Sequence, residues 1–148
     1  LDFVIMSFGS LYGPRANKFN FISNIIEEAL NSRQITRQGN GEEIREYIHI
    51  FDAAELCCKL IQNKYRNVIV NITGSQPYKV KNVLQLIKEI LGEDIIIKFN
   101  KKKILKDHYK ITPYSYKTRI AKKLINDGYI ELGEGILNLI NDKIKDKS

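Results

Sequence analysis

The side chains with the clearest chemical potential lie in one predicted strand, residues 44–50. Alternation along this strand places Arg45, Tyr47 and His49 on one face, while isoleucines occupy the other and predict a place in the core. A guanidinium is always charged and its planar fork suits phosphate oxygens, so the polar face is a candidate anion-binding surface. For His49 we expect a packed, hydrogen-bonded role rather than a catalytic one.

Other reactive residues are sparse. The sequence contains no CxxC, no HExxH and no cluster of His and Cys, so no metal site is expected. Cys57 and Cys58 are adjacent in a predicted helix, where a disulfide is rare, and we interpret both as small core residues in a reducing compartment. No Gly-rich dinucleotide-binding turn occurs, and Tyr78 and Tyr114 are followed four residues later by Asn82 and Thr118 rather than by Lys. We therefore expect no catalytic residue in this chain.

The elements that position these residues alternate between strand and helix, which predicts an α/β fold with a small mixed sheet. Helical periodicity predicts about five helices, at residues 20–32, 52–63, 80–91, 117–126 and 133–145. Extended apolar runs predict strands at residues 1–8, 35–38, 44–50, 68–72 and 95–99. The turn at residues 39–41, Gly-Asn-Gly, predicts a hairpin between the second and third of these strands.

The first predicted strand is almost continuously apolar, as in the middle of a parallel sheet. Such a strand needs a neighbour on both edges, so we interpret the chain as one incomplete domain, residues 1–148.

Three segments, in order, carry a family resemblance. They are SLYGPR at residues 10–15, GNG at 39–41 followed by REYIHIFDAA at 45–54, and VNITGS at 70–75. These are similar to N-V-Y-G-P-R, G-D-G-x-x-R-D-Y-I-H-V-x-D-x-A and Y-N-V-G-S-G of the extended short-chain dehydrogenase/reductase family. Within that family the chain resembles the NAD-dependent sugar-nucleotide epimerases and dehydratases, over nearly its whole length.

The resemblance implies that residues 1–148 form the C-terminal, substrate-binding part of a Rossmann-type enzyme. It implies that the NAD(P) cofactor and a catalytic Tyr/Lys pair belong to a preceding part, and that the parent is a homodimer. The isolated chain is then expected to bind the nucleotide diphosphate of a sugar nucleotide without catalysing a reaction.

The resemblance also assigns roles to individual residues. Arg45 and Tyr47 match the family residues that lie beside the substrate diphosphate, and Asn20 matches a diphosphate-contacting Asn, although a plain helix N-cap is the alternative. Ser10 stands where the family has Asn and can make fewer hydrogen bonds. Lys106 stands where the family has a substrate-binding Arg; the alternative is that it lies in a solvated lysine run. Phe8 matches a family position near the nicotinamide.

Charge leaves two further hypotheses open. The net charge of +7 favours an anionic partner, and a lysine cluster at residues 101–106 fits a basic nucleic-acid-binding module. However, no nucleic-acid motif accompanies that cluster, so we expect no nucleic acid as partner. A non-catalytic nucleotide-sugar sensor is the other alternative. No signal peptide and no apolar run of about 20 residues occurs, so we expect a soluble cytoplasmic protein without membrane contact.

Overall fold

The computed structural model describes residues 1–100 and 121–146 of the chain. The strands are β1 (Val4–Phe8), β2 (Ser10–Tyr12), β3 (Gln34–Gln38), β4 (Ile44–His49), β5 (Val68–Ile72), β6 (Pro77–Lys79), β7 (Ile96–Asn100) and β8 (Lys122–Leu124). The helices are α1 (Phe21–Ser32), α2 (Ile50–Leu60), α3 (Val80–Leu91) and α4 (Leu132–Lys145), with a short 3₁₀ helix, η1 (Asn63–Tyr65). The α/β fold class is confirmed.

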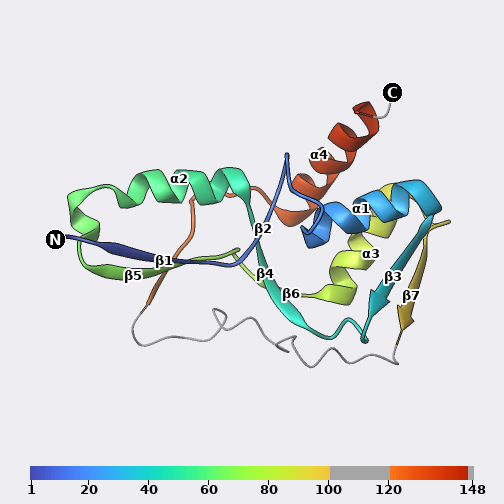
Figure 1. Cartoon of the computed structure of the whole chain (residues 1–148), viewed down its shortest axis with the longest axis horizontal. Helices are drawn as coiled ribbons and strands as arrows, with labels where there is room; N and C mark the ends of the chain where they lie inside the picture. Colours follow the sequence, from blue (N-terminus) through green and yellow to red (C-terminus); the bar gives the residue numbers. More distant parts are fainter. Residues whose placement is uncertain (101–120, 147–148) are drawn as a thin grey trace.

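The described strands form three small sheets (Figure 1). In the first, β5 lies between β1 and β8 and pairs in parallel with both. In the second, β4 lies between β2, its parallel neighbour, and β6, its antiparallel neighbour. The third consists of β3 and β7 in parallel. Helix α2 runs along the first sheet, whereas α1, α3 and α4 gather at the opposite end of the molecule, beside β3 and β7 (Figure 1).

Among residues 1–100 and 121–146, two apolar clusters make the core. One lies between α2 and the β1–β5 pair and contains Ile48, Leu56, Val70 and Ile72. The larger one is built by α1, α3, α4 and β3 and includes Tyr47. Adjacent residues of β4 therefore enter different clusters, and both of its faces are covered. The predicted division of this strand into a core face and a polar face is wrong, because Tyr47 and His49 are buried as completely as Ile48.

The predicted hairpin is also wrong. Gly39 and Gly41 do have positive φ angles, as such a turn needs, but β3 pairs with β7 and β4 pairs with β2 and β6. The connecting loop instead bonds to the start of α3: Gly41 O accepts from Lys81 N, and Glu43 O accepts from Val80 N, both at 2.9 Å. This arrangement buries Ile35 completely under the helices, which a free two-stranded hairpin cannot do.

The first strand differs from its expected central position. Within the described residues β1 pairs only with β5, and Ile5 and Met6 are about half exposed. The apolar run predicted two neighbouring strands, whereas in the described part of the chain β1 has one.

Some of the predicted helix ranges agree with the structure and others do not. The range 80–91 is exact, and 20–32 and 133–145 are within one residue. Helix α2 begins two residues before the predicted Asp52 cap, because His49 caps it and Asp52 is buried with its carboxylate accepting from Ile130 N at 3.0 Å. The helix predicted over 117–126 is wrong where it is described, since β8 occupies that part and pairs with β5. The two cysteines are free, but Cys58 is exposed rather than a core residue.

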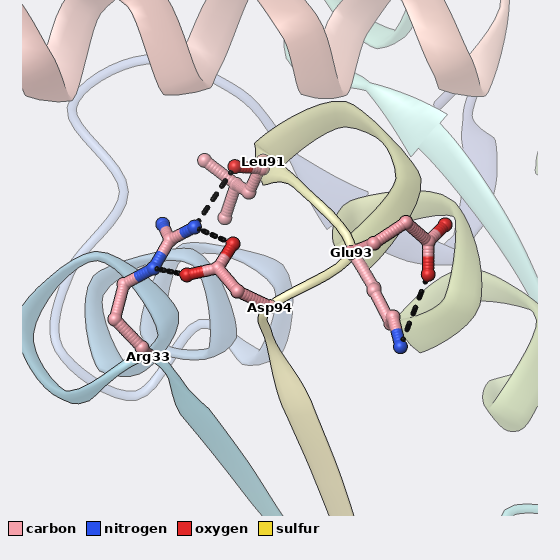
Figure 2. A network of polar contacts seen from close by, with 5 residues as sticks. Arg33, Leu91, Glu93 and Asp94 are labelled. Atoms are coloured by element: carbon pink, nitrogen blue, oxygen red, sulfur yellow. Dashed lines mark hydrogen bonds and ion pairs between the residues drawn. The ribbon is translucent and has the colours of Figure 1, made fainter.

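A polar clamp fixes the join between α1 and the β3–β7 pair. Arg33, in a left-handed conformation at the end of α1, donates from Nε to Asp94 Oδ2 at 2.7 Å and from Nη2 to Asp94 Oδ1 (Figure 2). The same Nη2 donates to Leu91 O at 3.2 Å, the carbonyl of the last α3 residue. A guanidinium that bonds both a carboxylate and a helix-terminal carbonyl ties the two helix ends together.

Candidate functional site

Strand β2 brings three of the predicted site residues together. Ser10 lies opposite Tyr47 in the parallel β2–β4 pair, and Arg45 is two residues earlier on β4. Asn20 is tied to the same strand, because its Nδ2 donates to Leu11 O at 2.8 Å. Its Oδ1 accepts from Ser23 N at 3.1 Å, so Asn20 is also the N-cap of α1, as the alternative interpretation held.

The Tyr47 ring is packed rather than solvent-facing. It stacks on Phe21 of α1, with ring centroids 6.4 Å apart and ring planes 24° from parallel. Burial raises the pKa of the Tyr47 phenol, and the nearby Arg45 and Arg37 guanidinium groups offset part of that rise. The Tyr47 hydroxyl is therefore neutral at neutral pH.

Arg45 is half-buried on the same strand. Its Nη1 donates to Ile44 O at 2.8 Å, and its Cα lies opposite Tyr78 in the antiparallel β4–β6 pair. The aromatic neighbours on two strands and the bond to a backbone carbonyl hold the guanidinium close to the sheet. An Arg held in this way loses less conformational entropy when it binds a phosphate than a freely rotating one.

A second arginine, Arg37 on β3, belongs to the same cluster and was missed from the sequence. Its guanidinium carbon lies 5.0 Å from the centroid of the Phe21 ring, and its Nη2 lies 3.8 Å from Glu43 Oε1. The available signal was the alternation in residues 34–38, which places a charged residue on the same face as the buried Ile35.

Two glycines set how closely the strands approach at this point. A Cβ at Gly74 would lie 2.0 Å from Tyr47 O, and a Cβ at Gly9 would lie 2.9 Å from Glu46 O. Gly74, in the loop after β5, and Gly9, between β1 and β2, must therefore lack a side chain for β4 to pack against them. These glycines serve backbone packing.

The described residues do not fit a dinucleotide. Neither Gly9 nor Gly74 opens a helix. Gly133 and Gly135 lie in the first turn of α4, but this helix begins well after β8 ends, so they do not form the tight strand-to-helix turn that cradles a pyrophosphate. Phe8, the predicted cofactor neighbour, ends β1 opposite Ile72 and packs against the cluster under α2. It offers only an apolar contact, and its proximity to a nicotinamide stays a prediction.

His49 has the packed role expected for it. Its Nδ1 accepts from Phe51 N at 3.3 Å, which caps α2, and its ring meets Tyr12 and Phe51 edge-on with centroids 5.2 and 5.0 Å away. Burial lowers the pKa of His49, so the neutral ring that can accept this bond is favoured.

Lys106 lies outside the described residues, as does the rest of the predicted lysine cluster. Over residues 1–100 and 121–146 no group of three His, Cys, Asp or Glu side chains is placed to hold a metal ion. In the same part of the chain, no helix is long and apolar enough to cross a membrane.

Comparison with known proteins finds relatives of the chain both by sequence and by fold. The model of the NAD dependent epimerase/dehydratase family matches residues 1–73. These residues include Phe8, Ser10, Asn20, Arg37, Arg45 and Tyr47. The chain is 26% identical over 103 residues to the uncharacterized UDP-glucose epimerase YtcB of Bacillus subtilis (strain 168), covering 69% of this chain and 33% of that protein. It is 27% identical over 92 residues to GDP-L-fucose synthase 1 of Arabidopsis thaliana, covering 56% and 28%.

Among solved structures, the UDP-N-acetylglucosamine 4-epimerase of Methanobrevibacter ruminantium M1 superposes with a TM-score of 0.79. At 18% identity this match covers 99% of this chain and 47% of that one, and it shows the fold alone. The chain thus spans about a third of the curated relatives and about half of the solved structure. The resemblance to the NAD-dependent epimerase/dehydratase family of extended short-chain dehydrogenases/reductases is confirmed: the family's model matches residues 1–73, and the relatives found by sequence and by fold are proteins of this kind.

Proposed function

We propose that this chain is the part of an NAD-dependent sugar-nucleotide epimerase or dehydratase that binds the nucleotide diphosphate. The proposal includes a preceding part of the enzyme that supplies the NAD(P) site and the catalytic Tyr/Lys pair. The observation that best supports this proposal is the register of β2 against β4. It pairs Ser10 with Tyr47, and Arg45 lies two residues before Tyr47, within the stretch that the family model matches.

Each residue has a binding or orienting task in this proposal. The Arg45 fork pairs with phosphate oxygens, and the backbone amides at the start of α1 add partial positive charge beside Asn20. The stacked Tyr47 and Phe21 rings keep water from one side of the diphosphate. Fixing the diphosphate in this way points the sugar toward the catalytic residues of the preceding part, and such positioning is worth several kcal/mol of the barrier, on the order of 7–11 in the best cases.

The relatives support a nucleotide sugar as the ligand class. The Bacillus subtilis protein is named for UDP-glucose, the Arabidopsis thaliana protein for GDP-L-fucose, and the Methanobrevibacter ruminantium structure holds UDP-N-acetylmuramic acid. All three ligands share a nucleoside diphosphate linked to a sugar and differ in base and sugar. We therefore place the diphosphate at Arg45 and leave the base and the sugar to the experiment.

The test is a calorimetric titration of UDP-, GDP- and dTDP-sugars into the chain, with NAD as a comparison ligand. We expect one class of nucleotide sugar to bind. Arg45→Ala should weaken it by about 1.5–3 kcal/mol, the size of a charge-assisted hydrogen bond, and Arg45→Lys should recover only part of this because Lys lacks the fork.

The matched control is Arg66→Ala. Arg66 is an exposed arginine that forms an ion pair with Asp2, and it follows η1 at the far end of the first sheet. If Arg66→Ala weakens binding as much as Arg45→Ala, the effect is one of general charge and the proposed site is wrong. If no nucleotide sugar binds but a nucleic acid does, with a steep loss of affinity as salt rises, the basic binding module is the correct function.

A further inference from the structure

Arg37 is a charged side chain that points into the protein. It lies two residues from Ile35, which is completely buried, and strand alternation puts both on the face of β3 that α1 and α3 cover. Only 19% of the Arg37 side chain is exposed. A cation at such a position needs compensation, because the interior solvates it poorly.

The compensation it receives is partial. The Phe21 ring faces the guanidinium at 5.0 Å, a distance at which the ring quadrupole attracts a cation. The carboxylate of Glu43 is 3.8 Å away, within the range of an ion pair but beyond that of a hydrogen bond. Buried Arg37 Nε and buried Glu43 Oε2 both have no hydrogen-bond partner. Buried charged pairs are normally bonded directly, so this one is held apart with bonding capacity to spare on both sides.

The Arg37–Glu43 pair is linked to the candidate site through the Phe21 ring. The Phe21 ring that contacts the Arg37 guanidinium also stacks on Tyr47. Arg37 and Tyr47 therefore contact the same ring, and Arg45 lies two residues before Tyr47 on β4.

We propose that Arg37 is a second phosphate-binding guanidinium, which leaves Glu43 and pairs with the ligand diphosphate when Arg45 does. This inference rests on the proposed function and names a residue of the same site. In the free protein Glu43 balances the charge of Arg37; in the bound protein the phosphate oxygens take its place. Glu43 then competes with the ligand for Arg37, and its own negative charge opposes binding.

This competition predicts a result that a purely structural ion pair does not. Removing the charge of Glu43 releases Arg37 and removes a repelling carboxylate, so Glu43→Gln should bind the ligand more tightly. Removing Arg37 takes away a phosphate contact, so Arg37→Gln should bind it more weakly. A pair that only stabilises the fold would weaken binding in both variants.

The experiment measures the Kd of UDP, GDP and dTDP for the wild-type chain and for Arg37→Gln, Glu43→Gln and the double variant, with Arg66→Gln as control. For the nucleotide that binds, we expect Kd to rise on the order of tenfold in Arg37→Gln and to fall several-fold in Glu43→Gln. The double variant has no uncompensated charge and should keep the wild-type melting temperature, yet it should bind as weakly as Arg37→Gln.

Two results overturn the inference. One is a weaker Kd in Glu43→Gln; the other is an unchanged Kd in Arg37→Gln while Arg45→Ala does weaken binding. In both cases the proposed function stands without Arg37. If the wild-type chain binds none of the three nucleotides, the proposed function is wrong, and so is this inference, which rests on it.

Discussion

The close approach of Gly74 to β4 gives the sharpest test of the structure. A Cβ at position 74 would lie 2.0 Å from the Tyr47 carbonyl oxygen, about 1.4 Å short of ordinary contact at 3.4 Å. The clashing atom belongs to the backbone and cannot turn away as a side chain can. Gly74→Ala therefore forces either the loop after β5 or the middle of β4 to move.

The expected cost follows from the behaviour of overpacked cores. Adding a methyl group to a well-packed site costs about 1–3 kcal/mol, and a backbone clash belongs at the upper end of that range. For a chain of this length, about 3 kcal/mol corresponds to a fall of roughly 6–12 °C in melting temperature. Because the clashing oxygen belongs to Tyr47, a residue of the candidate site, the variant should also bind nucleotide sugars less tightly.

The assay is urea-induced unfolding followed by circular dichroism, with Gly128→Ala as the matched control. A Cβ at Gly128 would meet no atom within 4 Å, so this second glycine-to-alanine change should leave the unfolding midpoint close to that of the wild type. Equal midpoints for the two variants would refute the strand crossing on which the site depends.

Three further predictions concern single contacts. Burial lowers the pKa of His49 below its ordinary 6.5, so stability should fall as the pH drops below about 6.5; His49→Asn, which can still cap α2, should remove that part of a pH series of melting temperatures. The hydrogen bonds from Arg33 lower the pKa of Asp94 below 3.8, so their stabilisation is present above that pH and lost below it. Asp94→Asn should lower the melting temperature at pH 7 and flatten its acid dependence. Lys123 Nζ donates to the buried Glu46 carboxylate at 3.1 Å, so Lys123→Met should cost about 2 kcal/mol in chemical unfolding, and Glu46→Gln should recover most of it.

Several elements were predictable because their signals are local. Helix α3 has the strongest amphipathic pattern and a glycine directly after its last residue, and its predicted range was exact. Strand β5 is a five-residue apolar run bounded by turn residues, and it too was exact. The family segments were equally visible, since residue types at fixed spacing are a property of the sequence itself.

Pairing between strands was not predictable in the same way. The Gly-Asn-Gly turn suggested that β3 and β4 are neighbours, yet each found its partner far along the chain, β3 at residues 96–100 and β4 at residues 10–12 and 77–79. Strand β8 was taken for a helix, because three residues carry too little periodicity to oppose a longer apolar pattern.

For the candidate site, the sequence alone predicted that Arg45, Tyr47, Asn20 and Ser10 belong to one family pattern, whose resemblance implies a nucleotide diphosphate as ligand. Only the tertiary structure decided that Ser10 lies against Tyr47, that Tyr47 is buried on Phe21, and that Arg37 joins them from another sheet. The physical reason is that residue type and spacing are written along the chain, whereas burial and electrostatic pairing depend on which distant segments share a core.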